Sequence, residues 1–210
     1  MINSGNGLFE KLEREITCIY GEATSGKTTF AKLAAIEQAK AGKKVVYIDT
    51  ENGFNVERVK QLAGENFEKV LENVLIFRPS RFREQNRIIK TLPSMKNISL
   101  IIIDTIGRHY RVKVKERPEI YNMHMNKQFS ILSGLAKEVP ILITNQVYSN
   151  LKSESVSMIG GERFKSWSKR IIRLDKEPRN IVFEKPGKEG MDFEIREDGI
   201  FKVLKEQVDE

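Results

Sequence analysis

The sequence predicts an α/β fold in which a mostly parallel sheet is covered by helices, and three observations support this. Short apolar runs rich in Ile and Val alternate with longer amphipathic stretches. A glycine-rich turn joins the first of these runs to a helix-favouring stretch. Near the C-terminus the runs shorten and are separated by turn residues, which indicates antiparallel strands. The 210 residues contain no Pro-, Gly- or Ser-rich linker, so residues 1–210 are expected to form a single domain.

Five uninterrupted apolar runs are expected to be the parallel strands, at residues 16–20, 45–49, 74–77, 100–104 and 141–144. The first helix is expected over residues 27–41, which are rich in Ala and Lys and end at Gly42. A second is expected over residues 119–138, where apolar residues recur at intervals of three and four. The antiparallel strands are expected at residues 171–174, 181–184, 193–196 and 200–203, with turns at 177–180, 186–190 and 198–199.

The composition of the chain excludes some classes of protein. The formal charge of +7 and the pI near 9.4 suit a polyanionic partner, but proteins with many surface lysines share them. The one cysteine, Cys18, lies in the first apolar run and is expected to be a small buried hydrophobe in a reducing, cytoplasmic compartment. The sequence has no secretory leader pattern and no apolar run near the ~20 residues that span a bilayer, so no membrane association is expected.

Residues 21–28 match the whole pattern of a phosphate-binding loop between a strand and a helix. Gly21 and Gly26 let the backbone turn tightly enough for its N–H groups to face phosphates at the positive end of the helix. Lys27 is expected to reach the β- and γ-phosphates, and Thr28 to offer its hydroxyl to Mg²⁺. This predicts a nucleoside triphosphate site. The residues assigned to it are Gly21, Glu22, Ala23, Thr24, Ser25, Gly26, Lys27, Thr28 and Thr29.

Three further strands end in residues that suit the chemistry of a triphosphate. Asp104 ends a buried strand and is the second candidate ligand to Mg²⁺, directly or through water. Glu51 follows another strand and could polarise a water for attack on the γ-phosphate, although a solvated loop residue fits the spacing equally well. Gln146 follows a third strand, where its amide can hydrogen-bond the γ-phosphate and signal to the next loop.

Taken in order, these motifs resemble the core of the RecA-like recombinases, and within them the archaeal RadA/RadB branch. The matching segments are the phosphate loop, residues 47–51, 100–105 and 143–147, and the pair Gly160-Gly161 leading to a basic strand. Residues 52–58 look like the nucleotide-proximal segment of that branch, and the resemblance extends over about residues 5–204. It implies a RecA-like P-loop ATPase core.

The resemblance also implies roles for individual residues. ATP would be the nucleotide, with Lys27, Glu51 and Gln146 as the catalytic set. Glu51 would activate the water, and Gln146 would sense the γ-phosphate. Arg58 would lie against the adenine, because a planar guanidinium stacks well on a ring system. An ordinary exposed helix position is the alternative for Arg58.

Two DNA-binding loops are implied at about residues 107–119 and 147–160. In the first, basic side chains are interleaved with aromatic ones against a single acid, Glu116, a mixture that can neutralise phosphates and stack on bases. A solvated basic loop is the alternative. The second loop is short and only weakly basic. The residues assigned to DNA are Arg108, Tyr110, Arg111, Lys113, Lys115, Arg117 and Lys152.

Only about twenty residues precede the phosphate loop, so neither an N-terminal helical DNA-binding domain nor a filament tether is expected in this chain. The resemblance then implies an accessory paralogue with at most a weak DNA-dependent ATPase activity. It would assist the main, RadA-type recombinase in DNA recombination and repair, near the nucleoid. Its other partners would be single-stranded DNA, with double-stranded DNA as a second candidate, and a homodimer is compatible with the sequence. The alternative is a RecA-fold signalling or clock-type ATPase that acts on protein partners without DNA.

Overall fold

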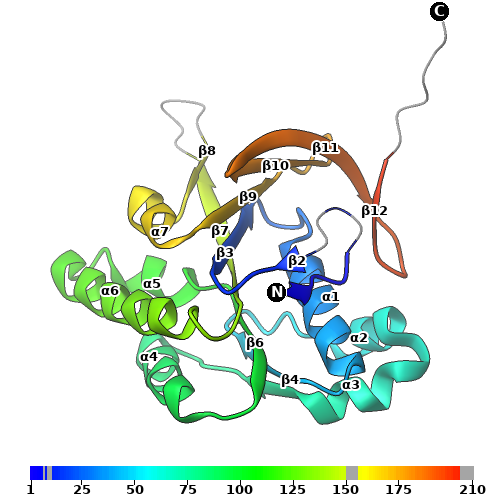
Figure 1. Ribbon diagram of the computed structural model, residues 1–210. Coiled ribbons are helices and arrows are strands. Elements are labelled where there is room, and N and C mark those ends of the chain that lie inside the picture. Colours follow the sequence, from blue (N-terminus) through cyan, green and yellow to red (C-terminus); the bar gives the residue numbers. More distant parts are fainter. Residues whose placement is uncertain (7, 9–10, 150–155, 204–210) are drawn as a thin grey trace, which may run out of the picture.

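The computed structural model describes residues 1–6, 8, 11–149 and 156–203. Its centre is a ten-stranded sheet in the order β12-β11-β10-β9-β3-β7-β6-β4-β5, with β8 paired to β7 (Figure 1). This confirms the predicted fold class. The parallel strands are β3 (Ile16–Gly21), β4 (Lys44–Asp49), β5 (Val74–Phe77), β6 (Ile98–Asp104), β7 (Ile141–Ser149) and β9 (Arg170–Leu174).

Antiparallel strands extend the sheet beside β9, as predicted. They are β10 (Asn180–Lys185), β11 (Gly187–Ile195) and β12 (Ile200–Lys202). A short strand, β8 (Val156–Met158), pairs antiparallel with the end of β7. Near the N-terminus, β1 (Ile2–Asn3) and β2 (Lys11–Leu12) form a separate two-stranded sheet.

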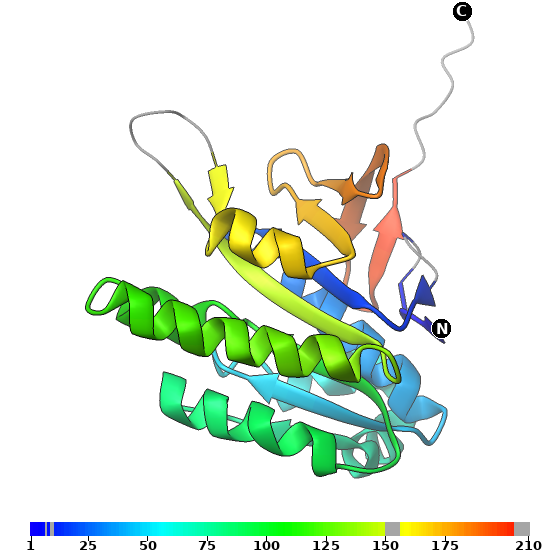
Figure 2. The same ribbon diagram turned by 60° about the vertical axis from the view of Figure 1, so that its left-hand side comes forward.

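Helices cover both faces of the sheet, and Figure 2 shows α4 and α6 running side by side on one of them. That face carries α4 (Phe82–Thr91), α5 (Arg108–Lys113), α6 (Pro118–Leu135) and α7 (Gly161–Trp167). The opposite face carries α1 (Lys27–Lys40), α2 (Val56–Ala63) and α3 (Phe67–Asn73). Short 3₁₀ turns lie at Gly64–Asn66 and Leu92–Ser94.

The continuous apolar runs of the sequence follow from this two-sided cover. Along β6, Leu100 and Ile102 point into the core under α1, whereas Ile101 and Ile103 point into the core under α6. Because successive side chains of a strand face opposite sides, a strand covered on both faces has apolar residues at successive positions. Cys18 on β3 is fully buried, as expected.

Several predicted boundaries are wrong. The first predicted DNA loop, residues 107–119, contains the helix α5 and the start of α6. β7 continues through residue 149 and pairs with β8, so both described ends of the second predicted loop, 147–160, are strands. Gly160-Gly161 leads into α7 before the basic strand β9, and the predicted turn 186–190 lies largely within β11.

The structure also contains helices and strands that were not predicted, and one residue assigned to DNA lies outside the described part of the chain. The strands β1, β2 and β8 and the helices α2, α3 and α4 are not predicted from the sequence, and the helix expected over 119–138 ends at Leu135. Lys152 lies outside the described residues. In the part of the chain that the structure describes, no helix is both long and apolar enough to cross a bilayer.

Candidate nucleotide-binding site

The phosphate loop lies between β3 and α1, and close packing explains its glycines. Gly26 precedes α1 with φ 108°, and a Cβ atom there would lie 2.7 Å from Cδ1 of Ile195. A Cβ atom on Gly21 would lie 2.2 Å from the carbonyl oxygen of Leu174. A larger residue therefore fits at neither position without a shift of the backbone or of β11. The loop leaves the N–H groups of the first turn of α1 available for an anion.

Lys27 opens α1 with a buried side chain that returns to the loop. Its Nζ donates to the carbonyl oxygen of Glu22 and lies 3.4 Å from Oγ of Ser25. Burial lowers the pKa of Lys27, and the neighbouring carboxylates of Asp104 and Glu51 oppose that shift. The ammonium is thus held beside both acidic groups that the sequence analysis assigned to the site.

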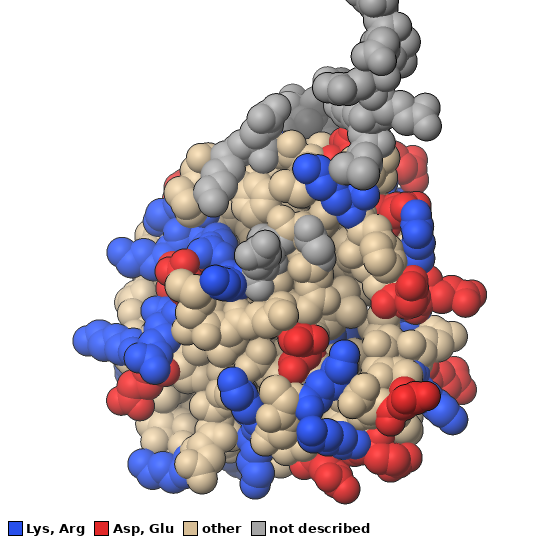
Figure 3. Space-filling model, turned by 45° about the vertical axis from the view of Figure 1, so that its right-hand side comes forward, with Lys and Arg blue, Asp and Glu red and all other residues tan. Residues whose placement is uncertain are grey.

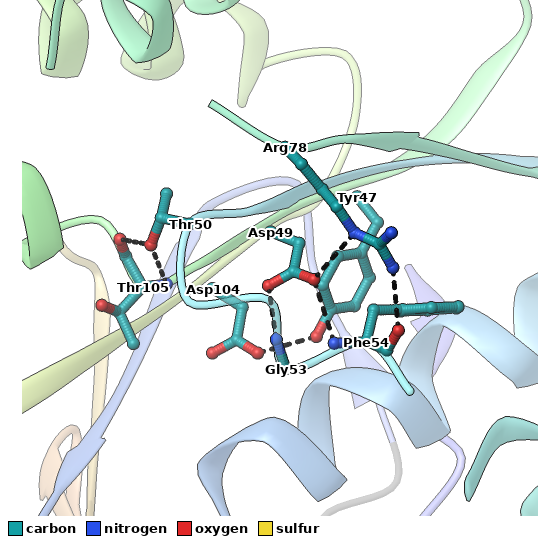
Figure 4. A network of polar contacts seen from close by, with 8 residues as sticks. All are labelled: Tyr47, Asp49, Thr50, Gly53, Phe54, Arg78, Asp104 and Thr105. Carbon is teal, nitrogen blue, oxygen red and sulfur yellow. Dashed lines mark hydrogen bonds and ion pairs between the residues drawn. The ribbon is translucent and has the colours of Figure 1, made fainter. Parts of the chain in front are cut away.

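Asp104 is buried at the end of β6, where two hydroxyl groups hold its carboxylate. The Tyr47 hydroxyl donates to Oδ2 over 2.8 Å (Figure 4). The Thr144 hydroxyl donates to Oδ1. Burial raises the pKa of Asp104, whereas hydrogen bonds from Thr144, Tyr47 and Thr28 oppose the rise. The Thr28 contact brings together the two oxygen groups predicted to hold Mg²⁺.

These two groups fit a magnesium ion that arrives with a nucleotide. Mg²⁺ prefers oxygen ligands and is usually held by one or two protein groups, waters and substrate phosphates. The hydroxyl of Thr28 and the carboxylate of Asp104 are such groups. Within the described ranges no cluster of three or more His, Cys, Asp or Glu side chains could hold a metal by itself.

The Tyr47 hydroxyl was not singled out from the sequence, and replacing it gives a stability prediction. Tyr47→Phe removes the donor to Asp104 Oδ2 and leaves a buried carboxylate oxygen with less compensation. We expect the free energy of unfolding to fall by about 1–3 kcal/mol, measured by urea denaturation. Tyr148→Phe, at an exposed tyrosine, is the control and should change it by less than about 0.5 kcal/mol. Equal values for the two variants would contradict the role of the hydroxyl.

Glu51, Gln146 and Arg111 form a continuous chain of side chains. The amide Nε2 of Gln146 lies 2.7 and 3.0 Å from the two carboxylate oxygens of Glu51. On its other side, Oε1 of Gln146 accepts from Arg111 Nη1 over 2.6 Å. Thr105 Oγ1 also donates to Glu51 over 3.1 Å. The predicted catalytic carboxylate is therefore linked through the predicted sensor to α5.

Sheet register explains why these residues meet. β3 pairs with β7 so that Gly21 lies opposite Gln146, and β4 pairs with β6 so that Asp49 lies opposite Asp104. The carboxyl ends of the parallel strands consequently share one edge, where ligands of open α/β sheets bind. Residues far apart in the sequence thus contribute to a single site.

Arg58 lies on α2 and reaches the turn between β11 and β12. Its guanidinium donates to the carbonyl oxygens of Glu197 and Arg196 over 2.6 and 2.8 Å. The side chain of Asn55 caps the helix by accepting from the amide of Arg58. Its predicted position against adenine stays a prediction, but the guanidinium is held in place by long-range contacts rather than extending freely into solvent.

The residues assigned to DNA are distributed over α5 and the segment that follows it. Arg108, Lys115 and Arg117 are exposed, and Lys113 pairs with Glu116 at 2.9 Å. Tyr110 differs from the expected stacking surface because its ring is buried against Phe164, with its hydroxyl bonded to Asn122. It packs α5 onto the core, and this anchoring directs Arg111 toward Gln146.

An arginine that was not predicted as a site residue supports the phosphate loop. Arg179, in the turn between β9 and β10, lies with Nη1 3.3 Å from the carbonyl oxygen of Thr24 and 3.4 Å from that of Ser25. It follows an X-Pro turn motif that gave no functional signal. These contacts are on loop carbonyl groups, so Arg179 supports the loop without using its N–H groups.

Comparison with known proteins shows the family of this chain. The Rad51 family model matches residues 6–185. A protein from Methanococcus maripaludis (strain C7), described as DNA repair and recombination protein RadB, is 39% identical over 201 residues, covering 91% of each chain. One of the same description from Methanoculleus marisnigri is 37% identical, covering 96% of this chain and 98% of that one. A crystal structure of the RadB recombinase superposes with a TM-score of 0.81 at 32% identity, covering 97% of this chain and all of that one. The chain therefore belongs to the Rad51 family of RecA-like proteins and is similar to its RadB members.

Proposed function

We propose that this chain binds ATP with Mg²⁺, binds single-stranded DNA through α5, and hydrolyses ATP slowly as an accessory to a RadA-type recombinase in recombination and repair. The observation that supports this best is the chain from Glu51 through Gln146 to Arg111. It connects the predicted hydrolytic carboxylate to the basic helix that would contact DNA. The RadB relatives are described as DNA repair and recombination proteins, which agrees with the proposed process.

The residues of the site suggest how hydrolysis would proceed. Lys27 would contact the β- and γ-phosphates, while Thr28 and Asp104 would hold Mg²⁺. The ion, when bound, would neutralise phosphate charge. Glu51 would accept a proton from the attacking water. We attribute slow turnover to the contact between Gln146 and the two carboxylate oxygens of Glu51, since Gln146 would have to turn from Glu51 toward the γ-phosphate before hydrolysis.

This change in the hydrogen-bond partner of Gln146 would couple ATP binding to DNA binding. When Gln146 turns toward a γ-phosphate, its hydrogen bond with Arg111 must lengthen or break, and α5 gains a free guanidinium. A groove of about 660 Å³ lies beside it, between α5 and the β7–β8 ribbon. Its lining residues are Tyr110, Arg111, Val112, Val114, Lys115, Val147, Tyr148, Ile159 and Gly160. Apolar walls with cationic side chains suit unpaired bases and their phosphates.

Net charge by itself does not locate the DNA surface. On the face in Figure 3, Lys and Arg side chains are more frequent toward the left and Asp and Glu toward the right, with both signs present near the centre and along the lower edge. The two signs of charge are therefore only partly separated on this face. The case for α5 accordingly depends on its link to Gln146 and on the groove beside it. Double-stranded DNA is a second candidate ligand, and a homodimer is a candidate assembly of this chain.

Replacing Arg111 tests the DNA part of the proposal. Arg111→Ala should weaken binding of fluorescein-labelled oligo(dT), measured by fluorescence anisotropy with a non-hydrolysable ATP analogue present. The loss of one phosphate contact should flatten the plot of log affinity against log salt by about 0.7 for single strands. The difference in DNA affinity with and without the analogue should also shrink, because the link to Gln146 is gone.

The matched control is Arg14→Ala, since Arg14 is exposed just before β3, at the opposite end of the sheet. It should leave both affinity and salt slope within experimental error. No DNA binding by the unmodified chain at low salt would reject the proposal in favour of a RecA-fold signalling ATPase. Unchanged affinity and slope in Arg111→Ala would reject the assignment of α5.

A further inference from the structure

An arginine outside every motif of the sequence analysis closes the turn that carries Glu51. Arg78 directly follows the edge strand β5, and its guanidinium makes two contacts (Figure 4). Nε lies 3.5 Å from Oδ2 of Asp49, and Nη2 donates to the carbonyl oxygen of Phe54 over 3.0 Å. The contacts are at the two ends of one turn. Arg78 therefore bridges the beginning and the end of residues 49–54.

Asp49 fixes the same turn from inside. Its side chain is fully buried, and its two oxygens accept from the amide groups of Gly53 and Phe54 over 2.9 and 3.0 Å. Asn52, within the turn, has φ 56°, a left-handed conformation that side chains other than Gly adopt at a cost. The turn thus has one left-handed position, at Asn52, and the contacts of Asp49 and Arg78 hold its two ends together.

The turn delivers two groups to the nucleotide site. Glu51 extends from it toward Thr105 and Gln146. A Cβ atom built on Gly53 would be 3.4 Å from Cγ2 of Thr28, so the backbone of the turn packs against the predicted Mg²⁺ ligand. Thr50 pairs with Thr105 in both directions, over 2.8 and 2.9 Å, and ties the turn to the end of β6. A shift of the turn would move Glu51 relative to the phosphate loop.

We propose that Arg78 is a positioning residue for hydrolysis: together with Asp49 it clamps the 49–54 turn and so sets the position of the Glu51 carboxylate. This inference rests on the proposed ATPase function. Arg78 itself is 24 residues from Phe54 and 29 from Asp49 in sequence, and its side chain is half exposed. A guanidinium suits this role because its separate N–H groups reach a carboxylate and a carbonyl at once.

The test compares Arg78→Ala and Arg78→Lys with Arg81→Ala, a neighbouring exposed arginine whose ion pair with Glu84 lies outside the turn. Hydrogen–deuterium exchange is read on a peptide covering residues 50–56, and kcat is measured with single-stranded DNA present. The Kd of a non-hydrolysable ATP analogue is measured by calorimetry. All assays are run below the melting temperature of each variant.

In Arg78→Ala we expect exchange at least about tenfold faster in this peptide, because Asp49, the acceptor of the Gly53 and Phe54 amides, loses its ion pair and the turn loses its bridge to β5. We expect kcat to fall about tenfold to 100-fold, with Kd changed by less than about twofold, since the misplaced group acts only on the chemical step. Arg78→Lys should stay low in kcat because the shorter lysine side chain lacks the two separate N–H groups that contact Asp49 and Phe54. Arg81→Ala should match the unmodified chain.

Each other outcome decides against one specific statement. Unchanged exchange in Arg78→Ala overturns the clamp. Faster exchange with unchanged kcat overturns the positioning of Glu51, and full activity in Arg78→Lys overturns the two-point contact. An unmodified chain that does not hydrolyse ATP at all rejects the proposed ATPase, whereas the exchange measurement still reports on the clamp. The failure of the inference is therefore distinguishable from the failure of the function.

Discussion

Glu51→Gln is expected to lower kcat for ATP hydrolysis by about 10²–10⁴-fold while the chain still binds ATP. The substitution keeps the size of the side chain and an oxygen that can accept from Gln146 and Thr105. What it removes is the carboxylate that takes the proton of the attacking water. A group that acts only in the chemical step changes kcat without changing ground-state binding.

The measurement is single-turnover hydrolysis of radiolabelled ATP with single-stranded DNA present, together with the Kd of ATP from calorimetry. Glu57→Gln is the matched control, because Glu57 is an exposed acid on the first turn of α2, close in sequence but outside the chain of contacts. It should keep the full rate. If Glu51→Gln hydrolysed ATP as fast as the unmodified chain, another group would have to activate the water.

Much of the site is predictable because it depends on a short-range rule. Strands buried on both faces read as apolar runs, and the residue that ends each run emerges at the ligand edge of a parallel sheet. Asp104, Glu51 and Gln146 were found in this way, and the structure brings Glu51 and Gln146 into contact. The phosphate loop was found by its full motif, which depends on spacing within eight residues.

The rest depends on contacts that spacing does not encode. The bond between Arg111 and Gln146 spans 35 positions, and that between Arg78 and Asp49 joins strand ends of β4 and β5. The sequence does not predict α5, because six residues rich in charge have little periodicity, and the buried ring of Tyr110 packs this helix onto the core. α7 is not predicted because a glycine such as Gly160 usually indicates a turn. Here Gly160, with φ 82°, directly precedes the helix.

Lys27→Ala is expected to abolish the stabilisation of the chain by ATP. A ligand present at 100 times its Kd stabilises the folded state by about 2.7 kcal/mol. In a chain of this length that corresponds to a rise in melting temperature of about 5–10 °C. Lys27 is the cation assigned to the β- and γ-phosphates, and without it the loop offers only backbone N–H groups. Differential scanning fluorimetry with and without Mg²⁺–ATP measures the difference.

The melting temperature of Lys27→Ala without nucleotide distinguishes a loss of ATP binding from a general loss of stability. Burial lowers the pKa of Lys27, which means that the folded state disfavours its charged form. Alanine removes that buried charge, so the melting temperature of the variant alone should fall by no more than about 3 °C. Lys40→Ala, at the exposed end of α1, is the control and should keep the full ATP-induced rise. A rise in Lys27→Ala equal to that of the control would show that ATP is held elsewhere, whereas a lost rise in an otherwise stable variant would assign the triphosphate to this loop.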